Sequence, residues 1–331
     1  MKKRAFLNMI FDPALAPHME EHYAYLRDNG YEWELYPDFS TIRDEQLLIE
    51  KLRDADVYIG AGIPYTARIM EACPRCRAIC RTGVGYDSID VDAATQHGIA
   101  VAITPGVSAE AVAEYAFSLM AAAARRVVEV DRTVRSGHWE RLVGCSLWHK
   151  TIGIVGLGRI GKKLAQIAHG FDMQVLAYDQ VHDEAFASSN RITYCDSLDE
   201  MLERCDFVSI HTNLSDTTRG LIAKPQLARM KPTAVLVNAA RGGILVEADL
   251  CEALSEGRIA AAALDVYERE PLAPDHPLRQ APHLILSTHN ADSSFEAKDA
   301  LIQAAFHNAV ALGRGETPEG LVNPECLLHR N

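Results

Sequence analysis

Six consecutive residues restrict the fold of this chain more than any other feature of its sequence. They directly follow a predicted strand at residues 151–155 and directly precede a predicted helix at residues 162–170. The six are Gly156, Leu157, Gly158, Arg159, Ile160 and Gly161. In such a run Gly156 permits a tight turn, Gly158 lets the backbone approach a pyrophosphate, and Gly161 lets the helix pack closely on the strand. Because the first amides of a helix attract phosphate, the pattern predicts a strand, turn and helix that bind a dinucleotide.

An acidic residue stands where a dinucleotide-binding unit needs one. The next predicted strand, at residues 174–178, is followed by Asp179, at the spacing of about twenty residues from the glycine run that this fold uses. An acid there accepts hydrogen bonds from the adenosine ribose, and its carboxylate would repel the 2′-phosphate of NADP. The following residue is Gln180 and not an arginine. We therefore predict NAD as the cofactor.

Short apolar runs alternate with amphipathic segments along most of the chain, which is typical of parallel sheets with crossover helices. Strands are expected at residues 4–10, 32–36, 57–60, 78–80, 151–155, 174–178, 207–210, 234–237, 262–264 and 284–286. Helices are expected at residues 18–29, 44–55, 109–130 and 295–312. A chain of 331 residues suffices for two domains of roughly 150 residues each. The predicted fold class is α/β, with two doubly wound parallel-sheet domains.

The segment at residues 136–150 follows the long predicted helix and has no regular period, so we expect an extended arm. It contains Trp139 and Trp148. Exposed tryptophans are typical of interfaces, but either ring could equally belong to a core.

The composition disfavours several classes of partner. The net charge of −12 disfavours nucleic acid and anionic membrane surfaces, because both need a concentrated basic face. No segment reaches the about 18 uninterrupted apolar residues of a spanning helix, and the N-terminal apolar stretch is too short for a signal peptide. We therefore expect a cytoplasmic protein. Cys73, Cys76 and Cys80 could suggest zinc, but a structural site needs a fourth ligand and no second C-x-x-C occurs, so we expect buried thiols and no metal.

Three residues in the second half of the chain follow predicted strands and form a chemically complementary set. Arg241 follows the strand at 234–237, Glu270 the strand at 262–264, and His289 the strand at 284–286. The carboxyl ends of strands in an open α/β sheet face the ligand. There the set could supply a cation for a carboxylate, a proton donor for a carbonyl oxygen and a group that tunes the donor, as reduction of a keto acid requires. Singly, each residue type is usually a surface residue, and the chain has 13 histidines.

In several motifs the chain resembles the D-isomer-specific 2-hydroxyacid dehydrogenases, a family with D-3-phosphoglycerate, D-lactate and glyoxylate/hydroxypyruvate enzymes. The resemblance covers nearly the whole chain. Its motifs are TGVGYDSID at 82–90, VAEYA at 112–116, GLGRIG at 156–161, NAARGG at 238–243, ALDVYEREP at 263–271 and THNAD at 288–292. The resemblance implies a flavodoxin-like substrate domain of residues 1–103 and 293–331, and a Rossmann NAD-binding domain of residues 104–292.

The resemblance also implies roles for individual residues. His289 would be the general acid in reduction and the base in oxidation, Glu270 would raise its pKa, and Arg241 would bind the substrate carboxylate. The backbone amides of Val84 and Gly85 would complete the carboxylate site. Further implied cofactor contacts are His211, Thr212, Thr217, Ala239, Ala240 and Asp265. His211 also ends a strand, but the resemblance assigns it to packing against the cofactor and not to proton transfer.

One departure from the family pattern bears on the substrate. Phosphoglycerate enzymes have an arginine near the end of the strand at 57–60, where this chain has GAGIPY at residues 60–65. A phosphate without a local cation is poorly bound. We therefore expect a small 2-keto or 2-hydroxy acid without phosphate, with Ile63 and Tyr65 lining an apolar pocket. We also expect a homodimer. An NAD-sensing, corepressor-like binding protein of the same fold stays open as the alternative, because such proteins retain the arginine, glutamate and histidine.

Overall fold

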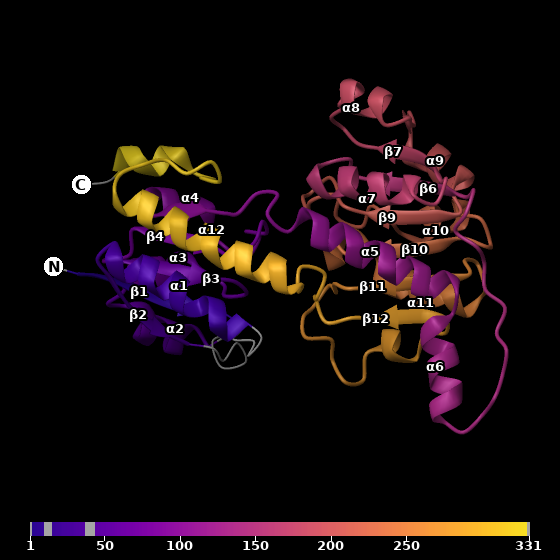
Figure 1. Ribbon diagram of the computed structural model, residues 1–331, viewed down its shortest axis with the longest axis horizontal. Helices are drawn as coiled ribbons and strands as arrows, with labels where there is room; N and C mark the ends of the chain where they lie inside the picture. The colour runs from indigo at the N-terminus through magenta and orange to yellow at the C-terminus, as the bar shows by residue number, and fades with distance from the viewer. Residues whose placement is uncertain (1, 10–14, 37–43, 330–331) are drawn as a thin grey trace. The chain divides into compact units, whose positions relative to one another are not determined.

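The computed structural model describes residues 2–9, 15–36 and 44–329 of the chain. The chain divides into two compact units. Unit 1 comprises Met1–Ser108 and Ser294–Asn331, and unit 2 comprises Ala109–Ser293. Each unit is built on one parallel sheet (Figure 1).

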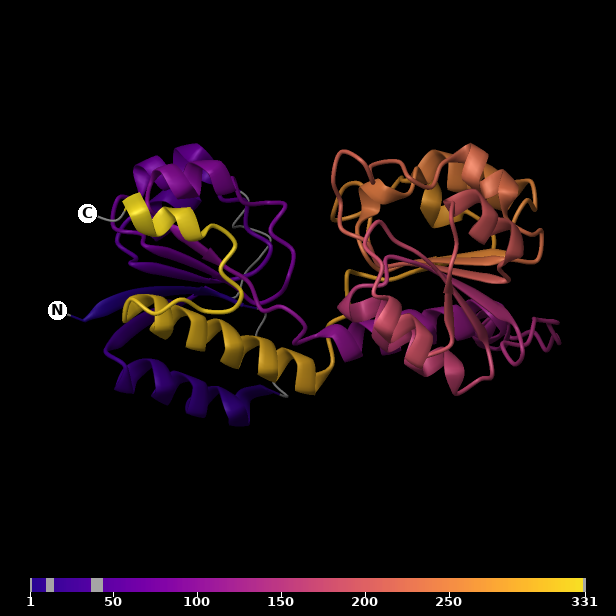
Figure 2. The same ribbon diagram turned by 90° about the horizontal axis from the view of Figure 1, so that it is seen from above.

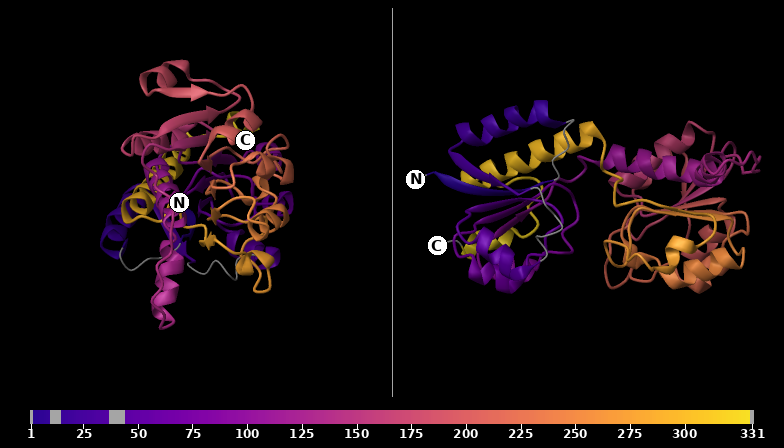
Figure 3. Two further views of the ribbon diagram at one scale, coloured as in Figure 1. Left: turned by 90° about the vertical axis from the view of Figure 1, so that its right-hand side faces the viewer. Right: turned by 90° about the horizontal axis from the view of Figure 1, so that it is seen from below.

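Unit 1 contains a five-stranded sheet in the order β2-β1-β3-β4-β5. The strands are β1 (Lys3–Asn8), β2 (Tyr31–Leu35), β3 (Val57–Gly60), β4 (Ala78–Arg81) and β5 (Ala100–Ala102). Helices α1 (Ala16–Asp28) and α12 (Phe295–Gly313) cover one face, as Figures 2 and 3 show. Helices α2 (Glu45–Leu52), α3 (Ala67–Ala72) and α4 (Val91–Gln96) cover the other face, and the short helix η4 (Pro324–His329) follows α12. The last long helix of the chain therefore packs on the first sheet.

Unit 2 contains a seven-stranded sheet in the order β12-β11-β10-β9-β6-β7-β8. The strands are β6 (Thr151–Val155), β7 (Gln174–Tyr178), β8 (Ile192–Tyr194), β9 (Phe207–Ile210), β10 (Val235–Asn238), β11 (Ala261–Leu264) and β12 (Leu284–Leu286). The order reverses between β6 and β9, which is the switch point where doubly wound sheets bind ligands. The predicted α/β fold class with two parallel-sheet domains is confirmed.

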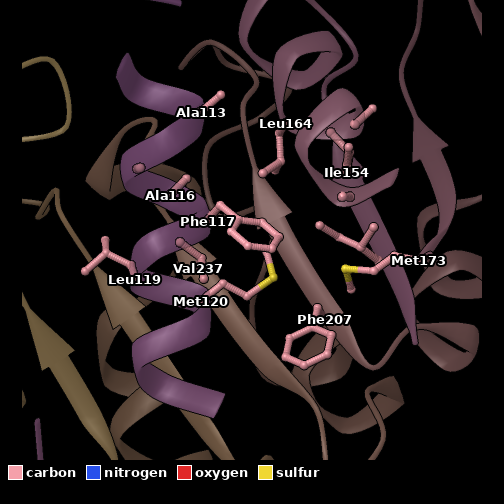
Figure 4. Close-up of a cluster of buried hydrophobic side chains, with 14 of the residues drawn as sticks. Ala113, Ala116, Phe117, Leu119, Met120, Ile154, Leu164, Met173, Phe207 and Val237 are labelled. Carbon is pink, nitrogen blue, oxygen red and sulfur yellow. The ribbon is translucent and has the colours of Figure 1, made fainter. Parts of the chain in front are cut away.

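Helices cover both faces of the second sheet. On one face lie α5 (Ala109–Ala124), α7 (Arg159–His169) and α8 (Glu184–Ser189). On the other lie α9 (Leu198–Arg204), α10 (Lys224–Arg229) and α11 (Glu247–Ser255), with the short helices η2 (Gly242–Ile244) and η3 (Pro277–Gln280) in the connections. Figure 4 shows Phe117 and Met120 of α5 and Leu164 of α7 converging on Ile154 and Phe207 of the sheet.

The single helix expected at residues 109–130 is a wrong prediction, because α5 ends at Ala124 and α6 (Val127–Arg135) starts after a left-handed Arg126 with φ of 55°. The arm that follows α6 returns across the end of α5, where the Cys145 N–H donates to the Ala124 carbonyl oxygen at 2.9 Å. A Cβ on Gly144 would lie 2.3 Å from that same oxygen. The helix therefore ends where a distant segment binds its last carbonyl groups, which local propensity does not reveal.

Further predictions concern the N-terminal strand, the two tryptophans, the cysteine cluster and membrane-spanning helices. Part of the strand expected at 4–10 lies outside the described residues. Trp139 is 86% exposed, whereas Trp148 is half-buried and packs on Phe171 with ring centroids 5.2 Å apart. Cys73, Cys76 and Cys80 are buried thiols that form no disulfide, as expected. Within the described ranges, no helix has the length and apolar character needed to span a membrane.

Candidate functional site

The glycine run forms the turn between β6 and α7. Gly156 has φ of 97°, and a Cβ there would lie 2.7 Å from backbone atoms of both His211 and Thr212. A Cβ on Gly161 would lie 2.2 Å from the carbonyl oxygen of Gly156. A Cβ on Gly158, by contrast, would meet no atom within 4 Å. Internal packing therefore requires the first and third glycines, while the open space beside Gly158 suits a pyrophosphate lying against the backbone.

Asp179 follows β7 and is held against this turn. One carboxylate oxygen accepts the Leu157 N–H at 2.7 Å, and the other accepts the Val181 N–H at 3.1 Å. The acid predicted to contact ribose thus lies beside the glycine turn. Arg159 is exposed at the start of α7, and Ile160 packs on the core of unit 2. These residues fit a bound dinucleotide.

The remaining predicted cofactor residues except Asp265 follow β9 and β10, which continue the sheet from β6. Burial lowers the pKa of His211 to about 4, and its Nε2 lies 2.7 Å from Ser209 Oγ. A histidine that is neutral at neutral pH is a poor proton donor, in agreement with its expected packing role. Thr212 and Ala240 are partly exposed, Thr217 is exposed and Ala239 is 8% exposed.

His289 and Glu270 form an imidazole–carboxylate pair after β12 and β11. Nδ1 of His289 lies 2.8 Å from Oε2 of Glu270, whose Oε1 accepts the Tyr267 N–H at 3.1 Å. The hydrogen bond with Glu270 raises the pKa of His289 above its ordinary value, although burial acts against it. Burial is the largest single effect on the pKa of Glu270 and raises it, but the hydrogen bond and charge of His289, the Tyr267 N–H and the charge of Arg241 together outweigh it, so the pKa lies below the usual range. The pair therefore favours the charged imidazolium.

Asp265 positions the turn that carries His289. Its side chain is fully buried, and its two carboxylate oxygens accept the N–H groups of Asn290 at 2.8 Å and Ala291 at 2.9 Å. Its carbonyl oxygen accepts the His289 N–H at 2.8 Å. These bonds give Asp265 a positioning role, and because each carboxylate oxygen can accept a second hydrogen bond, the expected cofactor contact stays a prediction.

Arg241 lies between β10 and η2, partly exposed, with one guanidinium nitrogen donating to the Ala240 carbonyl oxygen at 2.7 Å. It is near enough to His289 and Glu270 that its charge lowers the pKa of both. The adjacent Gly242 is required by a close approach, since a Cβ there would lie 1.8 Å from the Tyr267 carbonyl carbon. The loops after β10 and β11 thus touch backbone to backbone, which brings the arginine to the pair.

The predicted substrate residues all lie in unit 1. Val84 and Gly85 lie in the turn after β4, and the Gly85 carbonyl oxygen accepts Arg81 Nε at 3.0 Å. Ile63 and Tyr65 are each 1% exposed within the core between the sheet and helices α2 to α4, and Tyr65 stacks on Tyr58 at 5.5 Å between ring centroids. Side chains so deeply packed have no free surface for a ligand, which corrects the expectation that they line a pocket.

The sequence analysis did not identify Tyr267, whose hydroxyl binds the backbone just after β12 and two residues before His289. Its hydroxyl donates to the Ser287 carbonyl oxygen at 2.5 Å and accepts the Ser287 N–H at 3.1 Å. Tyr115 of α5 reaches the hydroxyl of the same serine at 2.6 Å. Its place in the motif at residues 263–271 could have marked Tyr267 as functional. Its role could not be predicted, because its partner Ser287 lies 20 residues further along the chain.

A turn built for a dinucleotide and a histidine–glutamate–arginine set at neighbouring strand ends are features of nicotinamide-dependent dehydrogenases. Residues 117–291 match the family model for the D-isomer specific 2-hydroxyacid dehydrogenase NAD binding domain. The chain belongs to this family, whose members are oxidoreductases that act on CH–OH groups.

Individual relatives cover nearly the full chain. A glyoxylate reductase from Korarchaeum cryptofilum is 40% identical over 99% of this chain and 98% of its own. The crystal structure of the TT0316 protein from Thermus thermophilus is similar with a TM-score of 0.86 and 31% identity, covering 96% of this chain and 99% of that one. An NADPH-dependent glyoxylate/hydroxypyruvate reductase from Sinorhizobium meliloti, in complex with NADP and malonate, gives a TM-score of 0.81 and 27% identity over 98% of each chain.

The histidine–glutamate pair predicts a measurable titration. In the protein without bound ligand, the pKa of His289 should lie above the ordinary value of about 6.5. Glu270→Gln should lower this pKa, because the substitution removes the negatively charged partner. The imidazole C–H resonances followed by NMR against pH measure both values, with His289→Asn used to assign the signal. Glu184→Gln, which alters an exposed carboxylate, should leave the titration unchanged. A pKa in Glu270→Gln equal to that of the wild type would contradict the assigned pair.

Proposed function

We propose that this protein catalyses reversible hydride transfer between NADH and a small 2-keto acid, forming the D-2-hydroxy acid. Unit 2, expected as residues 104–292, serves as the NAD-binding domain, and unit 1, expected as 1–103 and 293–331, serves as the substrate domain. The observation that carries the proposal is the hydrogen bond of 2.8 Å between His289 and Glu270, close to Arg241 and in the same unit as the glycine turn.

The proposed roles follow from the charges of the three residues. When bound, NADH supplies the hydride to the α carbon. No bond from a described residue reaches Nε2 of His289, so this nitrogen can give its proton to the carbonyl oxygen in reduction and take it back in oxidation. Glu270 stabilises the imidazolium, and the guanidinium of Arg241 pairs with the substrate carboxylate, a contact of about 1.5 to 3 kcal/mol. Val84 and Gly85 stay candidates for binding that carboxylate.

The proposed substrate lacks phosphate. The stretch after β3 at residues 60–65 contains no cationic side chain that could pair with a phosphate. Two relatives reported above are named for glyoxylate, which supports an unphosphorylated two- or three-carbon acid.

A panel of 2-keto acids tests this function. Oxidation of NADH, followed at 340 nm, should be fastest with an acid such as glyoxylate, hydroxypyruvate or pyruvate. It should be slower with 3-phosphohydroxypyruvate and fall by at least about a hundredfold in His289→Ala, because the proton donor is lost. Preferential turnover of the phosphorylated acid would contradict the substrate class. Tight NADH binding without turnover of any acid would favour the sensing role instead.

We further propose NAD over NADP, because both oxygens of Asp179 are fixed by backbone N–H groups and a fixed carboxylate repels a 2′-phosphate. Asp179→Asn removes the charge while keeping the shape. The ratio of the dissociation constants for NADPH and NADH, measured by fluorescence titration, should therefore fall by about tenfold. Glu184→Gln, a matched change at an exposed residue nearby, should not alter it. A wild-type protein that binds NADPH as tightly as NADH would refute the preference.

We propose that the chain forms a homodimer through α6 and the arm after it. Figures 1 and 3 show α6 projecting from the rest of unit 2, and none of its residues is buried. Apolar side chains exposed on this segment are Val127, Val134, Trp139 and Val143.

Light scattering should give the mass of two chains at micromolar concentration. Val143→Asp should shift it toward one chain, because a charge buried in an apolar interface is unfavourable. Val181→Asp, at another exposed valine of unit 2, is the control. A wild-type mass of one chain would rule out the dimer.

A further inference from the structure

Unit 2 contains an imidazole–carboxylate pair with a buried carboxylate, which the proposed mechanism does not use. Glu247, the first residue of α11, is 5% exposed and with Asp265 is one of two buried acids among the described residues. Its Oε2 lies 3.3 Å from Nε2 of His276. Its Oε1 accepts the Glu268 N–H at 2.6 Å. A buried carboxylate is costly unless several donors surround it, so these contacts are required by its position.

The protonation of His276 follows from its other ring nitrogen. Nδ1 accepts the Leu278 N–H at 3.3 Å, where His276 caps the short helix η3. A nitrogen that accepts a hydrogen bond carries no proton, so the proton of the neutral ring is on Nε2. The proton on Nε2 therefore faces Oε2 of Glu247 across the 3.3 Å contact, which becomes an ion pair when His276 is protonated.

Both partners of Glu247 lie on the loop that carries Glu270. Glu268 precedes Glu270 by two residues and His276 follows it by six. The side chain of Glu268 reaches back to the Glu247 N–H at 3.3 Å, which closes a reciprocal pair at the start of α11. Arg279 donates to the carbonyl oxygens of Leu272 and Ala273, each at 2.8 Å, within the same loop.

Three carboxylates crowd this loop, and the bonds to Glu247 act against their mutual repulsion. Glu268 and Glu270 both raise the pKa of Glu247 by their charge, in addition to the larger effect of burial, whereas the Glu268 N–H and His276 lower it. Mutual repulsion among three acids would move Glu270 away from α11 and from its bonding position. The two donors on Glu247 oppose that movement.

We propose that Glu247 and His276 act as a positioning clamp that fixes both ends of the Glu270 loop and so keeps Glu270 bonded to His289. Neither residue is a catalytic residue, since they act through Glu270. This proposal rests on the proposed function. It adds Glu247 and His276 to the residues that determine the protonation of His289.

Glu247→Gln tests the clamp, because the Glu268 N–H and His276 Nε2 contact different carboxylate oxygens, and glutamine replaces one of them with an NH2 group that cannot accept and removes the charge. Reduction of a keto acid needs protonated His289, so kcat/KM falls as the pH rises through its pKa. A loosened Glu270 lowers that pKa, so the alkaline limb should move to lower pH and kcat/KM at neutral pH should fall by about tenfold. The dissociation constant of NADH should stay within about twofold of the wild type, since the clamp touches none of the proposed cofactor residues. Glu252→Gln, the same change elsewhere on α11 at an exposed residue paired with Lys224, should match the wild type throughout.

His276→Asn gives an independent variant if Glu247→Gln fails to bind NADH and is therefore misfolded. Asparagine is a good cap for the Leu278 N–H but is too short to reach Glu247, so it removes only the contact with Glu247. The same alkaline shift is expected, and in the double variant the effects should not add, because both changes break one interaction. An alkaline limb at the wild-type pH in the folded variants overturns the clamp while leaving the proposed function intact. The proposed function itself fails only if the wild type turns over no keto acid.

Discussion

The buried carboxylate of Asp265 is the constraint on which the geometry of the candidate site depends most. A fully buried acid is strongly unfavourable unless hydrogen-bond donors surround it. The chain after β12 has to bring the N–H groups of Asn290 and Ala291 to this carboxylate, at 2.8 and 2.9 Å. His289 lies at the bend of that path, with φ of 55°, a left-handed conformation that a histidine seldom adopts without such support. The ring then meets Glu270, so the acid–base pair follows from a backbone constraint.

Sequence reasoning predicted the sheet strands of four or more residues and the residues of the glycine turn, because apolar period and glycine spacing are local signals. Of the strands with three residues, it predicted β12 but missed β5 and β8, since runs of that length show too little period to be found reliably. The break at Arg126 was missed for a different reason. The Cys145 N–H that binds the end of α5 is about twenty residues further on, and no local pattern announces a contact of that kind.

In the candidate site, too, local sequence signals predicted some features and tertiary contacts determined the others. Arg241, Glu270 and His289 could be selected because each follows a strand and belongs to a recognisable motif. What each neighbouring residue does depended on tertiary contacts. Ile63 and Tyr65 are apolar residues after a strand, a description that suits a pocket and a core equally, and the stacking of Tyr65 on Tyr58 places them in the core. For Asp265 the cofactor contact stays a prediction, whereas the two backbone bonds that its oxygens accept could be known only from the path of the turn after β12.

One electrostatic rule accounts for both the loops and the expected cofactor position in unit 2. The carboxyl edge of a parallel α/β sheet gathers helix N-termini and unpaired amides, which carry partial positive charge. Acids within the chain satisfy several of these amides. Asp179 binds Leu157 and Val181, Asp265 binds Asn290 and Ala291, and the Glu268 side chain binds the first amide of α11. The N-terminus of α7 differs, because Gly158 stands at its cap and offers no side chain. At three loops of this edge, carboxylates of the chain itself accept the backbone N–H groups. The N-terminus of α7 therefore stays available for the phosphates of a dinucleotide.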